Sequence, residues 1–311
     1  MFDILLLVLP VFLVVGLGYS LRGTGLVDTG FLAQMNRLVY FVAVPIMFFY
    51  KIAQSDFSAS FNARILAGIL ICIGTIAALS YLYGGVRHYD KARRGAFCQA
   101  AFRGNLVYIA LPIVYSAYGE AGFAVAGIII GFMTAVVNFL SIFVLMLPHR
   151  HVGPDLKASF WVHQIVFNPL ISSSFLGIIW SYFRLPIPMV LANAFDIISG
   201  MTLPLALIVI GASFSFQKLQ GEMTITMIAT TVKIVLMPLT AGIILYMLGV
   251  RGMEFGVGIL LTGAPVASTA YIMAQQLKGD ADLTSTIIMF STLISVLSYT
   301  LYLYFLKVIG I

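Results

Sequence analysis

Charged residues are scarce in this sequence. They make up 9% of its 311 residues, whereas a soluble domain carries about 25%, and 61% of the residues are hydrophobic. A soluble globule of this length cannot bury so much apolar surface, so a lipid bilayer must solvate much of it. The composition therefore excludes a soluble enzyme and predicts an integral membrane protein.

Motifs for catalysis and for metal binding are missing as well. The two cysteines, Cys72 and Cys98, lie in apolar runs, which argues against a disulfide or a metal site. The histidines lack helical metal-ligand spacing and no Walker loop is present, so ATP hydrolysis within this chain is excluded. The net charge of +6 comes from basic residues scattered over short loops, so we expect no nucleic acid partner. We also expect no enzyme activity, no metal and no cofactor.

Ten apolar runs of membrane-spanning length are present instead, joined by short connections. The expected spans are residues 3–21, 34–53, 64–84, 95–117, 122–147, 163–183, 190–211, 223–248, 253–275 and 284–307. The first run begins without a basic n-region, so a cleaved signal peptide is not expected. The pattern predicts an all-α integral membrane protein with ten transmembrane helices.

Basic residues in the connections are distributed unevenly between the two sides. Ten Lys and Arg, including the cluster at residues 87–94, belong to the side that follows odd-numbered spans, and five belong to the other side. Because the richer side usually faces the cytoplasm, we expect both termini on the non-cytoplasmic side of the cell membrane.

Three pairs of helix-breaking residues occur in corresponding spans of the two halves, and the residues of each pair are separated by nearly the same number of positions. They are Pro10 with Pro169 and Pro45 with Pro204, both 159 residues apart, and the breaks Gly104-Asn105 and Ala264-Pro265, 160 apart. Coincidental proline placement is the alternative explanation. Because five spans is an odd number, a second copy would enter from the opposite side. We predict two inverted five-helix repeats, residues 1–150 and 151–311, an arrangement typical of secondary transporters.

Each predicted half contains one interrupted span. In span four, Gly104 and Asn105 suit a break, but Pro112 suits one equally well, so its position stays open. In span nine, Gly263 can end one half-helix and Pro265 can begin the next. If the two spans cross, half-helix N-termini meet at the centre and favour an anion, especially a carboxylate. Ordinary proline kinks are the alternative.

Two basic residues fall inside spans. Lys233 lies roughly 15 Å deep in a core about 30 Å thick, where a charge is costly unless it is paired or hydrated. It attracts an anion, snorkels towards the membrane surface or pairs with a helix C-terminus. Arg103 contacts the anion, lines its vestibule or makes a structural salt bridge. The expected substrate-binding residues are Arg103, Asn105, Tyr108, Pro112, Lys233, Thr262, Pro265, Ser268, Thr269 and Tyr271. Asn138 is a further polar residue, which interhelical hydrogen bonding explains equally well.

Several of these stretches resemble the auxin efflux carrier family. They are residues 36–45 (NRLVYFVAVP), Asn105 followed by Pro112, residues 265–274 (PVASTAYIMA) and residues 282–292. The resemblance implies a ten-helix fold with crossed fourth and ninth helices, shared with sodium–bile acid symporters. It also implies a scaffold of spans one, two, six and seven, often homodimeric, and a mobile core of spans three to five and eight to ten.

The same resemblance implies an elevator-like carrier for a small organic anion. The short middle connection points to a bacterial form in the inner membrane, and bacterial members are commonly assigned to malonate, malate or other small carboxylates. Family members often have Asn where this chain has Thr269, which leaves the detailed substrate open. The rival functions are a sodium-coupled symporter of a larger amphipathic anion, a membrane-embedded enzyme and a channel. The expected partners are the substrate anion, lipid and a second copy of the chain.

Overall fold

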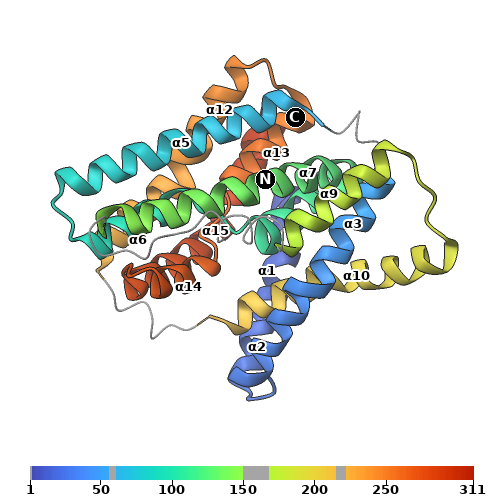
Figure 1. Cartoon of the computed structure of the whole chain (residues 1–311), viewed down its shortest axis with the longest axis horizontal. Coiled ribbons are helices and arrows are strands. Elements are labelled where there is room, and N and C mark those ends of the chain that lie inside the picture. Colours follow the sequence, from blue (N-terminus) through green and yellow to red (C-terminus); the bar gives the residue numbers. More distant parts are fainter. Residues whose placement is uncertain (1, 56–60, 150–167, 215–221) are drawn as a thin grey trace. The chain divides into compact units, whose positions relative to one another are not determined.

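The computed structural model describes residues 2–55, 61–149, 168–214 and 222–311, and its regular elements in these ranges are helices (Figure 1). Within these ranges, six helical segments are long and apolar enough to cross a membrane. They are Thr29–Gln54, Ala63–Val86, Leu106–His149, Met189–Ala212, Met223–Met247 and Ala281–Val308. For the described residues the predicted all-helical fold is therefore confirmed, and the six segments are consistent with an integral membrane protein. The count of ten spans in two inverted repeats stays a prediction.

Two compact units divide the chain. Unit 1 contains residues 1–62, 107–135 and 158–214. Unit 2 contains residues 63–106, 136–157 and 215–311. Each unit combines segments from both halves of the sequence. The division into repeats at residues 150 and 151, and into scaffold and mobile core, stays a prediction. The connection at 150–167, where the two halves would join, lies outside the described residues.

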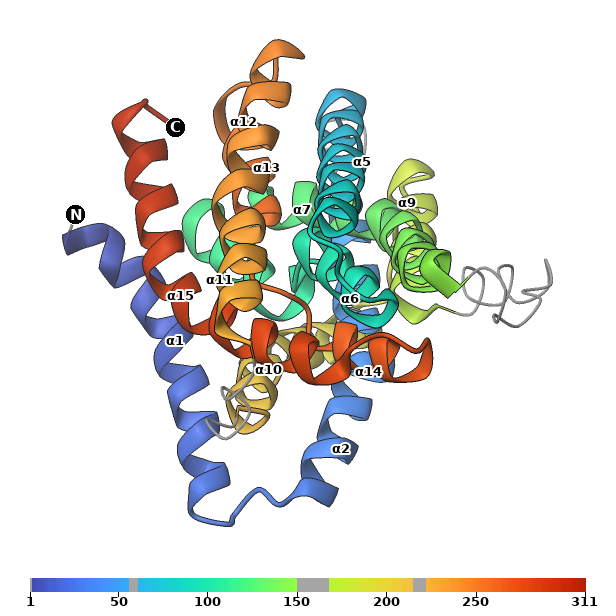
Figure 2. The same cartoon turned by 90° about the vertical axis from the view of Figure 1, so that its left-hand side faces the viewer.

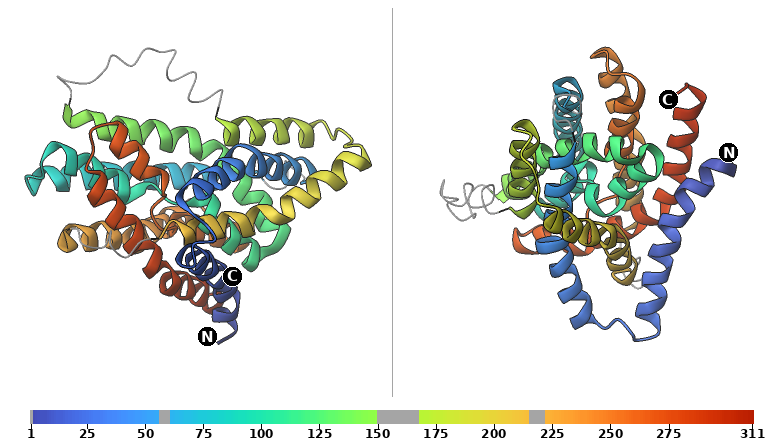
Figure 3. Two further views of the ribbon diagram at one scale, coloured as in Figure 1. Left: turned by 90° about the horizontal axis from the view of Figure 1, so that it is seen from below. Right: turned by 90° about the vertical axis from the view of Figure 1, so that its right-hand side faces the viewer.

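Unit 1 is built around two pairs of packed helices. Its helices are α1 (Phe2–Gly23), α2 (Thr29–Leu38), α3 (Val44–Gln54), α9 (Pro169–Tyr182) and α10 (Met189–Ala212). Helix α1 packs along α10, and α3 packs along α9. Glycine permits the first contact, because a Cβ on Gly211 would lie 1.8 Å from the carbonyl oxygen of Val15. Figures 2 and 3 show α1 and α2 diverging from the loop that joins them.

Unit 2 contains the described α-helices that do not belong to unit 1, apart from one helix that is divided between the two units. They are α5 (Ala63–Val86), α6 (Lys91–Phe102), α11 (Met223–Thr231), α12 (Met237–Met247), α13 (Gly252–Thr262), α14 (Thr269–Gln276) and α15 (Ala281–Val308). Helix α12 packs against α5 and α13, side by side in Figure 2. Buried apolar residues from α6, α11 and α15, together with Val266 and Ala270, form a core. Helix α7 (Leu111–Met146), kinked at Gly119 and followed by the 3-10 turn η3 (Leu147–His149), belongs partly to each unit.

Among the residues that the structure describes, three five-residue π-helices each end two residues before a proline. They are η1 (Val39–Ala43) before Pro45, η2 (Leu106–Ala110) before Pro112, and η5 (Val232–Leu236) before Pro238. Proline has no N–H and its ring clashes with the carbonyl four residues earlier. The wider turn avoids the clash, since Met237 N–H donates to the carbonyl of Val232, five residues back. These turns are local irregularities of the helices, and such turns often mark functional sites.

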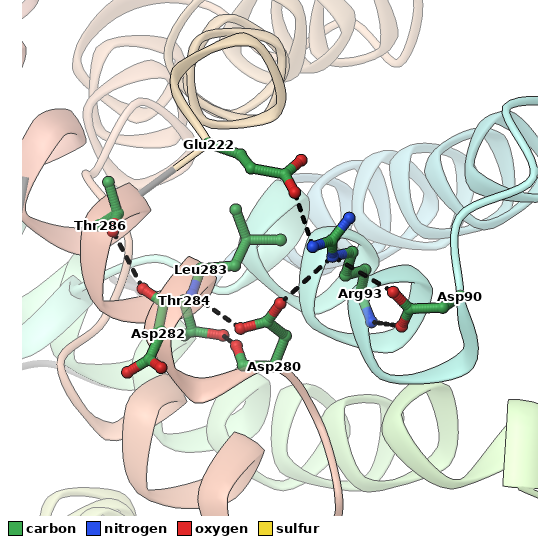
Figure 4. Close-up of polar contacts among 8 residues, drawn as sticks. All are labelled: Asp90, Arg93, Glu222, Asp280, Asp282, Leu283, Thr284 and Thr286. Carbon is green, nitrogen blue, oxygen red and sulfur yellow. Dashed lines mark hydrogen bonds and ion pairs between the residues drawn. The ribbon is translucent and has the colours of Figure 1, made fainter. Parts of the chain in front are cut away.

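One arginine joins three helix starts in unit 2 (Figure 4). Arg93 forms ion pairs with Asp90 at 3.2 Å, Glu222 at 2.6 Å and Asp280 at 3.6 Å. These carboxylates stand at the N-caps of α6, α11 and α15, where negative charge is favourable. Arg93 offsets their mutual repulsion and so ties the three helix ends together.

Candidate functional site: two paired helix breaks in unit 2

The first break lies between α6 and η2. Helix α6 ends at Phe102, and its C-cap Arg103 is extended, with φ −78° and ψ 99°. Gly104 takes part in a β-bridge, and η2 then begins at Leu106. The chain is helical again around Pro112, the second residue of α7. The span is thus interrupted at Arg103–Asn105 and not at Pro112, which decides between the two positions that the sequence left open.

The second break lies between α13 and α14. Helix α13 ends at Thr262 with Gly263 as its C-cap, and α14 begins at Thr269. Pro265 therefore lies in the nonhelical stretch, and the prediction that it begins the second half-helix is wrong. Gly263 is required here because a Cβ at this position would lie 2.3 Å from the ring of Tyr302. The close approach lets α15 pack directly against the end of α13.

The two breaks pair with each other through their backbones. Gly104 and Val266 form an isolated antiparallel β-bridge. The Asn105 N–H donates to the carbonyl of Pro265 at 2.7 Å, and the Ala267 N–H donates to the carbonyl of Arg103 at 3.1 Å. Backbone groups that each helix leaves unbonded are thus satisfied by the other break, as the interior of a membrane protein requires.

Arg103 lies beside this pairing and is nearly buried, with 8% of its surface exposed. Its guanidinium donates to Ser141 Oγ and to Asn138 Oδ1, both at 2.9 Å. It also donates to Thr269 Oγ1 at 3.2 Å. Thr269 is exposed and is the first residue of α14, so the guanidinium lies close to the positive end of that helix. The arrangement concentrates positive potential at one end of the paired breaks.

Lys233 lies in η5 and is fully buried. Its Nζ donates to the carbonyl oxygen of Thr262 at 2.6 Å and lies 3.3 Å from Met237 Sδ. Gly104 is also close, because a Cβ there would lie 3.3 Å from Nζ. The structure shows one of the roles that the sequence allowed for Lys233, the pairing with a helix C-terminus, and its contact with an anion stays a prediction.

Comparison with known proteins identifies the family of the chain. Residues 3–303 match the membrane transport protein family. The chain belongs to this family. The resemblance to auxin efflux carriers is thereby confirmed over nearly the whole length.

Three relatives of this membrane transport protein cover almost the whole chain. An uncharacterized transporter of Methanothermobacter thermautotrophicus is 27% identical over 95% of this chain and 96% of its own. An uncharacterized transporter of Methanocaldococcus jannaschii is 24% identical over 96% of this chain and 97% of its own. A third relative, from Rhizobium meliloti, carries the provisional name of malonate transporter. It is 24% identical over 97% of this chain and 95% of its own.

The predicted site residues of this membrane transport protein are divided between the two units. Tyr108 and Pro112 belong to unit 1, where the Tyr108 hydroxyl donates to Asn36 Oδ1 at 3.0 Å. The other eight belong to unit 2. Among these, Tyr271 packs against the apolar core, and Thr262 Oγ1 bonds back to carbonyls of its own helix. Whether any of the ten contacts substrate stays a prediction.

Three residues outside the predicted set of site residues support the breaks. Ser141 bonds Arg103, Ser291 Oγ accepts from the Val266 N–H at 3.1 Å, and the Tyr302 hydroxyl donates to the carbonyl of Ile234. Ser141 could have been found, because it follows Asn138 by three residues and so lies on the same helix face. Within the described ranges, no group of three or more His, Cys, Asp or Glu could hold a metal ion.

Proposed function

We propose that this membrane transport protein is a secondary carrier of a small carboxylate, such as malonate. The observation that carries the proposal is the Arg103 guanidinium, buried beside the paired breaks and bonded to the first residue of α14. Inverted-repeat carriers bind substrate where interrupted helices expose polar backbone. The relative with the provisional name of malonate transporter supports the same substrate class.

The chemistry around Arg103 suits a carboxylate. A guanidinium presents planar pairs of N–H donors that match the two oxygens of a carboxylate. The hydroxyl of Thr269 can exchange its bond with Arg103 for one with substrate. The N-terminal end of the α14 dipole adds about half a positive charge. Ser268, partly exposed just before α14, offers one more hydroxyl donor.

Transport would follow an elevator-like cycle. In this proposal unit 2, which contains both breaks, carries the bound anion across the membrane while unit 1 serves as the scaffold, often in a homodimer. Support comes from the internal cohesion of unit 2, where the paired breaks, the apolar core and the Arg93 ion pairs link helices distant in sequence. A body that moves as a whole needs such internal links.

Binding can be tested by thermal unfolding of the purified protein with malonate, malate and succinate, and with taurocholate as an amphipathic anion. A ligand that binds only the folded state raises the melting temperature. We expect stabilisation by a small dicarboxylate, its loss in Arg103→Gln and its retention in Lys91→Gln, which removes an exposed charge from α6. Stabilisation by taurocholate alone, and only with sodium, would favour the rival symporter. Uptake into proteoliposomes then separates a carrier from a binding protein.

We further propose an inner-membrane orientation with both termini outside, from the ten-to-five distribution of basic residues. Single cysteines at Lys91 and Arg184, both exposed, are predicted to lie on opposite sides. The native Cys72 and Cys98 are buried and give a low background. In intact cells an impermeant maleimide should label Arg184→Cys and spare Lys91→Cys; the reverse pattern would invert the topology.

A further inference from the structure

The C-terminal end of α13 is bonded to a lysine side chain from another helix. The last four carbonyls of an α-helix have no partner within the helix, and together they carry about half a negative charge. Thr262 is the last residue of α13, and its carbonyl oxygen accepts from Lys233 Nζ at 2.6 Å. The bond therefore places the amine of a lysine at the negative end of the half-helix α13.

Half-helix ends of this kind are where ion-coupled carriers bind their cation. Exposed carbonyls of interrupted helices coordinate Na⁺ or H⁺ in such proteins. A bound Na⁺ needs several oxygen ligands and must leave again on the other side of the membrane. Lys233 is covalently attached and cannot leave, so the carbonyl that it occupies is not available to a travelling cation.

The local fold holds Lys233 in this place. It lies in the π-turn η5, and Pro238 cannot donate to the carbonyl of Ile234, four residues earlier. The Tyr302 hydroxyl from α15 donates to that carbonyl instead. The Lys233 amine is also packed beside Gly104, since a Cβ there would lie 3.3 Å from Nζ. The amine thus lies next to both breaks. It extends from the turn η5, which α15 stabilises through Tyr302.

We propose that Lys233 is a tethered substitute for a coupling cation at the end of α13, so that the protein needs no sodium or potassium at this position. The location of the amine comes from the contacts above. The consequence for coupling rests on the proposed carrier function. Lys233 acts on the breaks as a positioning residue and does not contact the substrate.

Chemical rescue tests the location without any substrate. Lys233→Ala removes the amine and most of its stem, leaving a buried space beside an unpaired carbonyl. Ethylammonium restores both parts, so we expect it to raise the melting temperature of Lys233→Ala by about 2–4 °C. The wild type and Lys233→Met should not respond, because the site is filled in both. Tetramethylammonium, which has no N–H donor, should have no specific effect on any of the three.

Two results would overturn the inference. One is an equal response of Lys233→Ala to ethylammonium and tetramethylammonium. The other needs no variant: a melting temperature of the wild type that is about 2–4 °C higher in NaCl or KCl than in N-methylglucamine chloride at the same ionic strength. If Lys233→Ala does not fold, the wild-type comparison still decides. Failure of the carboxylate assay would refute the proposed function while leaving the rescue result intact.

Discussion

Arg103 and Lys233 are both buried basic residues beside the paired breaks, yet their partners differ in kind. Arg103 donates to side chains, including the exposed hydroxyl of Thr269. Lys233 donates to a backbone carbonyl, at a site with no exposed surface. Side-chain partners can rotate away and be replaced by a ligand. A helix-end carbonyl inside a membrane protein has no such alternative.

The difference suggests a division of labour between the two cations. Arg103 is placed to exchange partners during binding and release, whereas Lys233 is placed to keep one end of α13 satisfied throughout. A variant of Arg103 should therefore change ligand affinity more than stability. A variant of Lys233 should do the opposite. The four predictions below test this contrast.

The largest effect on stability is expected for Lys233→Met. The substitution keeps most of the side-chain volume but leaves the Thr262 carbonyl without its donor. An unsatisfied buried polar group costs roughly 1–3 kcal/mol. Thermal unfolding in detergent should show a clearly lower melting temperature, whereas Lys91→Met, the same change at an exposed position, should leave it unchanged. Normal stability together with a strongly raised substrate constant would instead make Lys233 a substrate ligand.

Arg103→Gln should mainly weaken substrate binding. Glutamine can still donate to Ser141 or Asn138, but it loses the charge and the fork of donors. Hydrogen bonds to charged groups contribute roughly 1.5–3 kcal/mol, so the dissociation constant should rise roughly 10- to 100-fold. Arg103→Lys should recover only part of the affinity, since it keeps the charge without the planar geometry. Calorimetric titration with the stabilising carboxylate measures both, and unchanged affinity in Arg103→Gln would remove Arg103 from the site.

Tyr302→Phe tests whether the π-turn that holds Lys233 depends on its neighbour. The change removes the donor to the Ile234 carbonyl and keeps the ring that packs on Gly263. Its cost should be about 1 kcal/mol of unfolding free energy, the usual net value of one hydrogen bond. Tyr304→Phe, on the same helix but with 43% exposure, is the matched control and should be neutral. Equal melting temperatures for the two variants would show that η5 is stable without this bond.

The sequence predicted the features that lipid and backbone chemistry impose. The apolar runs at 64–84 and 190–211 correspond closely to α5 and α10, because the length of a continuous apolar run limits the helix that it forms. The break at Pro265 was also predicted, and Gly104 was one of two candidates for the break in span four, since glycine and proline act on their own backbone.

Features that depend on distant partners could not be predicted in the same way. Pro112 was as good a candidate for a break as Gly104, and the outcome depended on the bridge to Val266 and on the π-turn η2. Similarly, nothing near Lys233 in sequence indicates that its amine bonds Thr262, 29 residues away. The choice among the roles of a buried cation is made by packing, which local patterns do not encode.

The smallest effect separates two threonines that flank the second break. Thr269 Oγ1 accepts from Arg103, whereas Thr262 Oγ1 bonds only to carbonyls of its own helix among the contacts described. Thr269→Val keeps the shape and removes the hydroxyl, so the carboxylate should bind roughly 2- to 10-fold more weakly, as expected for one neutral hydrogen bond. Thr262→Val keeps the backbone carbonyl that Lys233 needs and should leave both affinity and melting temperature nearly unchanged. Because the two variants make the same chemical change, their difference in affinity reports which side of the break faces the ligand. A larger loss of affinity in Thr262→Val than in Thr269→Val would move the binding site away from Arg103 and towards Lys233.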